Sequence, residues 1–388
     1  MSRPTSTQIV DKLFAEKFRI IFILITLASA YVVTQLITPY HETSQLEFYT
    51  EEAEPTYLRA EVVSLDENEG TAKVIDGPQA GTLLPVHSYG EEKLRPGAEI
   101  LISSDTEVDE PSTVVAVWRL PVLIWMLAFM IVAVVIVGGR QGAKSLLGLG
   151  ASIAVIVFYI IPQVLDGANA LAVSTIGAFV IATLTILLGH SMAWRTWISL
   201  LAIYVALAFV IILAWMTGWA ANLTGVYDET SSYLGFAPGL ADIDLYGILL
   251  GGIIIATLGV LDDVVTTQVA AVDEFRQLKP HASWRELVAR GMSVGREHLS
   301  AVINTLALAY VGVALPTILA LSQTLGDSQG LLMTLNYEYL SVEIVRLIIS
   351  TLGIIMAIPL ATVLGAWLIG RKQQILGILK RVQPKLRR

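Results

Sequence analysis

The chain has 388 residues, of which 55% are hydrophobic and only 15% are charged. Soluble domains average about 25% charged residues, so the composition excludes an ordinary soluble protein and indicates a chain that lies mostly in lipid. The absence of cysteine excludes disulfides, thiolate metal sites and cysteine nucleophiles. A net charge of −8 argues against nucleic-acid binding.

Apolar segments of about 20 residues, the length needed to cross a bilayer, recur along the chain. We expect an all-α polytopic membrane protein with about eight transmembrane helices, at 20–38, 120–138, 146–165, 171–189, 198–219, 245–265, 301–322 and 346–370. With eight crossings, every cluster of lysine and arginine falls on one side, which the positive-inside rule identifies as the cytoplasm. Both the N-terminus (1–19) and the basic tail (371–388) are therefore predicted to be cytoplasmic.

Residues 41–118, between the first two predicted spans, are strongly acidic, with seventeen Asp and Glu against four Lys and Arg. Period-2 alternation and turn residues predict short strands at 57–65, 71–76, 80–86, 98–104 and 112–118. Five short strands in so few residues favour a small closed, OB-like barrel. Because it follows a span that starts in the cytoplasm, this β-domain is predicted to be extracytoplasmic, ahead of a transmembrane helical domain over 120–370.

Acidic residues continue out of the predicted span 245–265. Helical spacing puts Asp262, Thr266 and Asp273 on one face. An adjacent stripe holds Asp263, Thr267 and Glu274, and above it Gly252 and Gly259 are expected to let another helix approach closely. A charged group near the centre of a span costs about 2.5 kcal/mol or more. We therefore interpret these polar side chains as candidates for ion coupling, with an interfacial acidic cap as the alternative.

The segment after these carboxylates predicts a second helix with polar residues of its own. Ser283 and Glu286 form a capping-box pattern, and the following residues favour an amphipathic cytoplasmic helix near 283–299. Supporting polar partners are expected around the next span: Asn304 and Thr305, which could hydrogen-bond the carboxylates, and Arg296 and His298, which could neutralise them or relay protons.

The sequence shows no motif typical of an enzyme or of a metal site. The five histidines show no metal-ligand spacing and there is no P-loop, so we predict no metal site and no cofactor. An intramembrane aspartyl protease needs two carboxylates on facing helices. Here Tyr227-Asp228 falls in a predicted loop and Gly259-x-x-Asp262 has the wrong spacing, so the protein is predicted not to be an enzyme.

Three stretches resemble the YibE/YibF-like family of bacterial multipass membrane proteins: 259–274, Gly291-Met-Ser-Val-Gly-Arg296, and Asn304-Thr-Leu-Ala-Leu-Ala-Tyr-Val-Gly312. The resemblance covers about 57–370 and implies a multi-span protein of the bacterial plasma membrane, but no particular activity. A weaker likeness concerns the last three spans: an aspartate pair, an amphipathic helix and two further spans look like part of a resistance–nodulation–division transporter. In that superfamily such a pair carries a proton relay.

Two classes of function follow. The first is a proton- or cation-coupled transporter, permease or export-assisting protein that uses Asp262 and Asp263. The alternative is a membrane scaffold or accessory subunit whose external β-domain binds an envelope partner. The expected partners are the lipid bilayer, an envelope protein or a small-molecule or ion cargo, and a second copy of the chain, but no nucleic acid.

Overall fold

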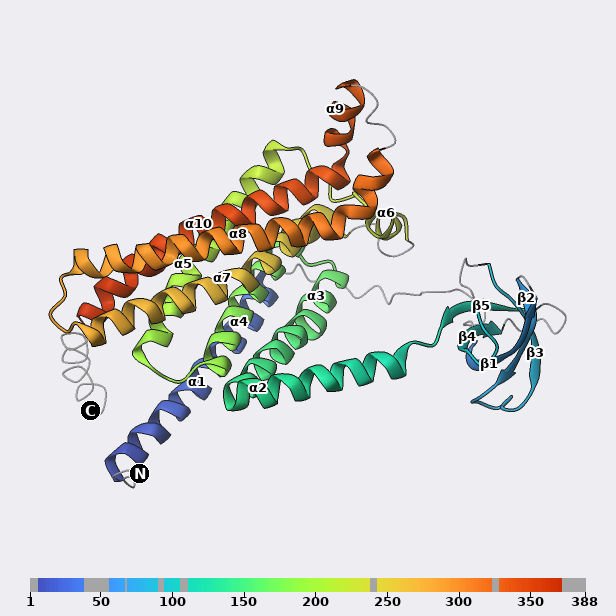
Figure 1. The fold of residues 1–388 in the computed structure, drawn as a ribbon, viewed down its shortest axis with the longest axis horizontal. Coiled ribbons are helices and arrows are strands. Elements are labelled where there is room, and N and C mark those ends of the chain that lie inside the picture. Colours follow the sequence, from blue (N-terminus) through green and yellow to red (C-terminus); the bar gives the residue numbers. More distant parts are fainter. Residues whose placement is uncertain are drawn as a thin grey trace. The chain divides into compact units, whose positions relative to one another are not determined.

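A computed structural model describes residues 6–37, 56–66, 68–89, 94–104, 111–237, 243–322 and 328–371. The chain divides into two compact units. One comprises Gln45–Gly139 and contains a β-barrel, and the other comprises Met1–Ser44 and Arg140–Arg388 and is a bundle of helices (Figure 1).

The five predicted strands are confirmed and close into a small barrel. They are β1 (Thr56–Asp66), β2 (Glu69–Val74), β3 (Leu83–His87), β4 (Glu99–Ser104) and β5 (Ser112–Val117). The order around the barrel is β1-β2-β3-β5-β4, in which only the β3–β5 pair is parallel. Alternation sends Ala60, Val62, Ile100 and Ile102 inward, and all four are buried. The small barrel predicted from the sequence is therefore present.

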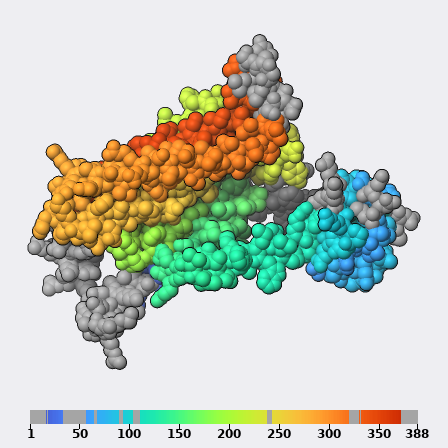
Figure 2. All heavy atoms as spheres, viewed as in Figure 1, coloured from blue at the N-terminus to red at the C-terminus, as the bar shows by residue number. Residues whose placement is uncertain are grey.

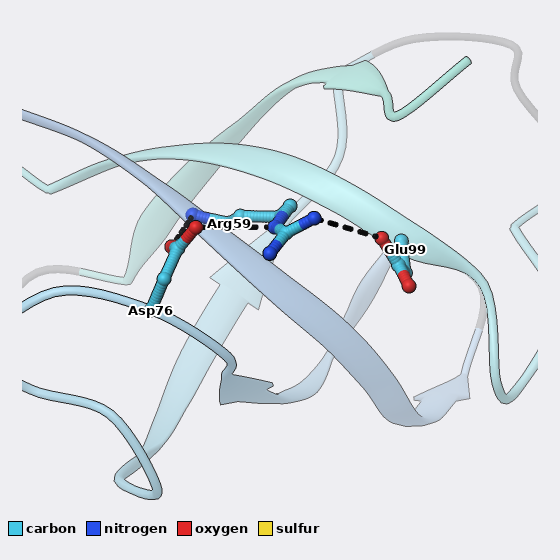
Figure 3. A network of polar contacts seen from close by, with 3 residues as sticks. All are labelled: Arg59, Asp76 and Glu99. Atoms are coloured by element: carbon cyan, nitrogen blue, oxygen red, sulfur yellow. Dashed lines mark hydrogen bonds and ion pairs between the residues drawn. The ribbon is translucent and has the colours of Figure 1, made fainter. Parts of the chain in front are cut away.

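A polar network on the barrel joins two strands to a turn (Figure 3). Nε of Arg59 in β1 lies 3.1 Å from Oδ2 of Asp76, whose Oδ1 also accepts the Arg59 backbone N–H. Nη1 of Arg59 lies 3.7 Å from Oε2 of Glu99 in β4, and its guanidinium is 5.4 Å from the centre of the Trp118 ring. These contacts reinforce the β1–β4 pairing that closes the barrel.

The rest of the chain is helical. Its elements are α1 (Ser6–Ile37), α2 (Leu120–Val155), the π-helical turn η1 (Ile156–Ile160), α3 (Ile161–Leu165), α4 (Ala170–Gly189), α5 (Trp194–Ala220), α6 (Glu229–Phe236), α7 (Leu245–Leu278), α8 (Trp284–Ser322), α9 (Ser328–Asn336) and α10 (Glu338–Gly370). Within the described residues, six helices are long and apolar enough to cross a membrane, and α1 has a shorter apolar part, Arg19–Val33.

The count of about eight spans differs from these six helices at two places. The predicted spans 120–138 and 146–165 fall in one long helical segment, Leu120–Leu165. It contains a non-helical residue, Gly139, with φ 54° and ψ −138°. Such a backbone conformation favours glycine, so the sequence boundary between the two spans coincides with a break inside the helix. The predicted span 20–38 lies in α1.

Helix α7 occupies the centre of the bundle and packs against α4, α5, α8 and α10 (Figure 1). Its fully buried side chains include Leu250, Ile253 and Leu261, which form one core with buried residues of α4, α5 and α10. Helix α1 packs on α4. Figure 2 shows α8 and α10 running side by side along one face of the bundle. Two different sides of α7 therefore meet different neighbours.

The glycines expected to permit close helix contact are not the ones that do so. A Cβ added at Gly252 or Gly259 would meet nothing within 4 Å, whereas one at Gly251 would collide with Ser174 of α4. On α8, a Cβ at Gly295 would come within 2.5 Å of Ile358 Cγ2. Adjacent residues on a helix point about 100° apart, so Gly252 faces away from the helix that Gly251 contacts.

The predicted amphipathic segment near 283–299 is not a separate element. Helix α8 runs without a break from Trp284 to Ser322, and Ser283 Oγ accepts the Glu286 backbone N–H at its start, as the capping pattern predicted. Gly291 lies against Thr362 and Val272. The first turns of α8 therefore pack between α7 and α10 and continue directly into the apolar part.

Candidate functional site

A cavity of about 370 Å³ lies beside Asp262, between α7, α4 and the later part of α2. Asp262 is seventeen residues from the start of α7 and sixteen from its end, so it lies near the middle of a 34-residue helix. The cavity wall is apolar except for seven polar side chains: Ser145, Ser152, Thr185, His190, Asp262, Asp263 and Thr266. It is therefore a local polar space in a strongly apolar bundle.

Two polar atoms facing this cavity have no hydrogen-bond partner in the part of the chain that the structure describes. They are Oδ1 of Asp262 and Nδ1 of His190, and both are buried. A buried polar atom without a partner costs about 1–3 kcal/mol, and more if it is charged. Most proteins avoid this cost, so the coincidence of two such atoms at one cavity calls for an explanation.

Three hydroxyl groups near Asp262 donate hydrogen bonds to backbone carbonyls. Ser152 Oγ donates to the Gly148 carbonyl, Thr185 Oγ1 to the Ala182 carbonyl, and Thr266 Oγ1 to the carbonyl of Asp262 itself. Each hydroxyl hydrogen is thus directed to a backbone carbonyl of its own helix. The Thr185 side chain is nevertheless a hydrogen-bonding neighbour of the Asp262 carboxylate, whose buried Oδ1 has no partner among the described residues.

His190 is positioned by the end of α4. It is the C-cap residue of that helix, with its backbone N–H bonded to the Ile186 carbonyl. The preceding carbonyl, of Gly189, accepts a 2.7 Å hydrogen bond from Nε2 of Gln141 in α2. A Cβ added at Gly148 of α2 would lie 3.5 Å from Thr185 Cα. These contacts fix α2 against α4 and so define the wall that faces Asp262.

A second cavity, of about 260 Å³, shares His190 and Thr266 with the first. It extends along α4, α5 and α7, and its lining includes Arg195, Ser199 and Thr267. His190 therefore borders both spaces, one with Asp262 and the other with Arg195. This arrangement places an imidazole between a carboxylate and a guanidinium.

The remaining carboxylates of the two predicted stripes lie in other settings. Asp263 borders the first cavity but is exposed. Asp273 is partly buried and accepts a hydrogen bond from Nε2 of Gln277, and Glu274 is exposed. Of the four, Asp262 alone combines a place on the cavity with an unpartnered buried oxygen among the described residues.

The polar residues expected to support the aspartates from the following helix do not line either cavity. Asn304 and Thr305 are exposed, and Thr305 Oγ1 donates to the Ala301 carbonyl of its own helix. Arg296 is exposed and donates to the Met292 carbonyl, while His298 is partly buried. In the structure, residues of α4 and its C-cap, Thr185 and His190, occupy the position beside Asp262 instead.

A different side of α7 carries buried polar residues that are hydrogen-bonded to neighbouring helices. Nε2 of Gln268, which is buried, donates to the Gly291 carbonyl of α8 and to Thr362 Oγ1 of α10, both at 2.7 Å. Three turns earlier on the same side of α7, Thr257 Oγ1 lies 2.8 Å from Ser350 Oγ of α10. These polar groups fasten α7 to α8 and α10.

Long apolar helices, a cavity with a buried acidic group and a small barrel are together consistent with a multi-pass membrane protein. A family comparison makes the assignment more specific: residues 126–371 match the model of the YibE/F-like protein family, and the chain belongs to that family. The match includes α4, α5, α7, α8 and α10, and so both cavities. Neither the curated proteins nor the solved structures gave a match, so the weaker likeness to resistance–nodulation–division transporters gains no support.

Proposed function

We propose that this protein is an ion-coupled membrane transporter, permease or export-assisting protein in which Asp262 binds and releases the coupling ion. The observation that carries the proposal is the unpartnered, buried Oδ1 of Asp262 on a cavity that is also lined by His190, whose buried Nδ1 has no partner among the described residues. A carboxylate oxygen without a fixed partner can take up and release a cation at little structural cost.

A proton suits this site better than a metal cation. Hard divalent cations take six or more oxygen ligands, whereas a proton needs one basic atom. The hydroxyls of Ser152, Thr185 and Thr266 already donate to backbone carbonyls. An imidazole has two ring nitrogens, so it can accept a proton on one and release a proton from the other. His190 borders both cavities and is therefore suited to pass protons to and from Asp262.

The proposed orientation follows from the charge distribution. Asp262 lies about 25 Å along α7 from Leu245, at 1.5 Å per residue, and so within a hydrocarbon layer of about 30 Å if the span begins at that end. The basic segments then lie in the cytoplasm together with both termini, in the plasma membrane of a bacterium. The barrel lies on the extracytoplasmic side.

The direct test compares two neighbouring aspartates with the same substitution. Sealed proteoliposomes carrying a pH-sensitive dye would report proton flux for the native chain, for Asp262→Asn and for the matched control Asp263→Asn. We expect Asp262→Asn to lower the flux by about a hundredfold and Asp263→Asn to leave most of it. Equal fluxes in all three proteins, or no flux from the native chain under an imposed gradient, would contradict the proposal.

The alternative function, a scaffold or accessory subunit, rests on the barrel. Among the described residues, pairing of β3 with β5 covers only Val86 and His87, so within that part of the chain Leu83–Pro85 has an edge with no strand beside it, and Leu83 and Tyr89 nearby are exposed. Such an edge can accept a strand from a partner. Crosslinking of the full-length protein in native membranes, compared with a variant lacking the barrel, would decide. This function would be favoured if a specific envelope protein were recovered only with the barrel present and if the Asp262→Asn variant kept the function of the native protein.

A further inference from the structure

At one end of the bundle a cavity of about 550 Å³ is formed by the ends of α7 and α10 and the start of α8. These three helix ends meet at the same end of the bundle in Figure 1. The cavity is lined by two arginines, Arg276 and Arg371, and by two tryptophans, Trp284 and Trp367, over a small apolar floor. It is separate from the cavities beside Asp262, with which it shares no residue.

Both guanidinium groups lack a carboxylate partner among the described residues. Arg276 Nη1 donates to the Ala282 carbonyl, and Arg371 lies over the Trp367 ring at 4.8 Å from its centre. The carboxylates of the flanking turns are engaged elsewhere: Asp273 with Gln277, and Glu286 with Lys279 at 2.6 Å. Two positive charges therefore line one cavity whose described lining includes no acidic residue, and such a site attracts an anion.

The apolar surface next to the cavity indicates the rest of the ligand. Trp284 and Trp367 are 46% and 45% exposed, and tryptophan is enriched where a membrane-spanning helix meets the headgroups. Further along α10, Val363 and Met356 are also exposed and share a helical stripe with Trp367. This stripe leads from the two arginines along the outside of the bundle, as an acyl chain would below its headgroup.

The chain's own C-terminal tail is a poor occupant. Residues 372–388 contain six Lys and Arg and no Asp or Glu, so they carry the same charge as Arg276 and Arg371 and are repelled by them. A phosphate group, in contrast, accepts charge-assisted hydrogen bonds from arginine, often from both arms of the guanidinium. The combination of two guanidiniums with an apolar stripe fits a molecule that has an anionic head and an apolar tail.

We propose that this cavity binds the phosphate of an anionic phospholipid, with Arg276 and Arg371 on the phosphate and one acyl chain along Trp367, Val363 and Met356. Bound lipid joins the ends of α7 and α10 to the start of α8. The inference does not depend on transport: it requires only that the bundle lies in a membrane, so a failure of the flux experiment leaves it standing and its own failure leaves the flux result standing.

The test uses the full-length protein in nanodiscs of phosphatidylcholine alone or mixed with phosphatidylglycerol. We expect phosphatidylglycerol to raise the unfolding temperature by about 4 °C or more, and native mass spectrometry to find phosphatidylglycerol retained on the protein. Both effects should disappear in Arg276→Gln/Arg371→Gln. The matched control is Arg285→Gln/Arg290→Gln, which removes the same charge from two exposed positions of α8 and should keep both effects.

Further arms separate the possible outcomes. Arg371→Gln alone, at an exposed residue that ends α10, should weaken lipid retention even if loss of the Arg276–Ala282 hydrogen bond unfolds the double variant. Inorganic phosphate added to phosphatidylcholine nanodiscs should give no comparable stabilisation, because it lacks the acyl chain. Equal retention of phosphatidylglycerol by the native chain and Arg371→Gln, or equal loss in the control pair, would overturn the proposal. Stabilisation by phosphate alone would do the same.

Discussion

Two sides of the central helix α7 treat polar residues in opposite ways. Toward α8 and α10, Gln268 and Thr257 are buried and hydrogen-bonded to residues of those helices. Toward α4 and α2, Asp262 faces a cavity and one of its buried oxygens has no partner in the described structure. Thr257 and Gln268 are eleven residues apart and share a face, and Asp262 lies about 120–140° around the helix from them.

The difference separates a structural role from a functional one. A buried amide that donates both hydrogens to neighbouring helices stabilises one arrangement and leaves no donor for a ligand. A buried carboxylate with an unmet hydrogen-bonding capacity reduces stability, and active sites commonly retain such costs. We therefore expect substitutions on the two sides to change stability in opposite directions.

The largest effect is expected at the Glu343–Arg346 pair of α10. The two charges are 2.7 Å apart with side-chain exposures of 9% and 19%, one turn before the Ser350 that contacts α7. Arg346→Leu would leave Glu343 buried without its partner. We expect a loss of about 3–5 kcal/mol in the free energy of unfolding, measured by reversible denaturation in detergent.

The control for that prediction replaces both charges. Glu343→Leu/Arg346→Leu removes the unpaired charge together with the pair, and such replacements are often close to neutral. A double variant as unstable as Arg346→Leu would mean that the loss comes from changed side-chain shape and not from an uncompensated carboxylate.

The contrast between the two sides of α7 is tested directly by one substitution at two positions. Gln268→Leu removes two buried hydrogen bonds and should lower the free energy of unfolding by about 1–3 kcal/mol. Asp262→Leu removes a carboxylate whose buried Oδ1 has no partner among the described residues, beside a cavity that has room for the new side chain, and should raise stability by about 1 kcal/mol or more. Flux should be lost only in Asp262→Leu when corrected for the folded fraction. If both Gln268→Leu and Asp262→Leu lowered the free energy of unfolding, the proposed difference between the two sides of α7 would be wrong.

Much of the fold could be predicted because its signals are local. Each apolar segment and each β-strand is encoded by its own residues, through hydropathy, period-2 alternation and turn glycines such as Gly77 and Gly97, both of which have positive φ. The positions of the break at Gly139 and of the barrel strands follow from the same signals. Closure of the barrel through the parallel β3–β5 pair does not, because it joins residues distant in the sequence.

The site was only partly predictable, since sequence gives depth along a helix but not the direction a side chain faces. Asp262 was found because a carboxylate in an apolar segment is conspicuous. The depth of Asn304 and Thr305 along their span predicts a place beside the carboxylates, yet both are exposed. His190 was missed because it is 72 residues from Asp262 in the sequence. Its signal, a histidine directly after an apolar helix that ends in Gly189, gains meaning only when α4 packs against α7.

Glycine substitutions sharpen the account of how α8 is held to the hydrogen-bonded side. Gly295→Ala would place a Cβ 2.5 Å from Ile358 Cγ2 and 3.1 Å from Gln268 Oε1, and should cost about 1–2 kcal/mol through overpacking. Gly252→Ala, the matched control, meets nothing within 4 Å and should gain about 0.5–1 kcal/mol from helix propensity. Thermal unfolding of the two variants measures this difference. Similar stabilities would show that α8 does not pack closely at Gly295.

The smallest effect is expected at Arg59 of the barrel, which provides a baseline for exposed polar contacts. Its partners Asp76 and Glu99 have side-chain exposures of 52% and 44%, and exposed ion pairs contribute about 0.2–1 kcal/mol each because water and salt screen them. Arg59→Met keeps most of the aliphatic side chain and should weaken hydrogen-exchange protection of the β1 and β4 amides by less than about tenfold, with the difference shrinking at high salt. If instead Arg59→Met cost as much as Gln268→Leu, burial could not be the reason that the hydrogen bonds of Gln268 stabilise α7. The contrast between its two sides would then need another cause.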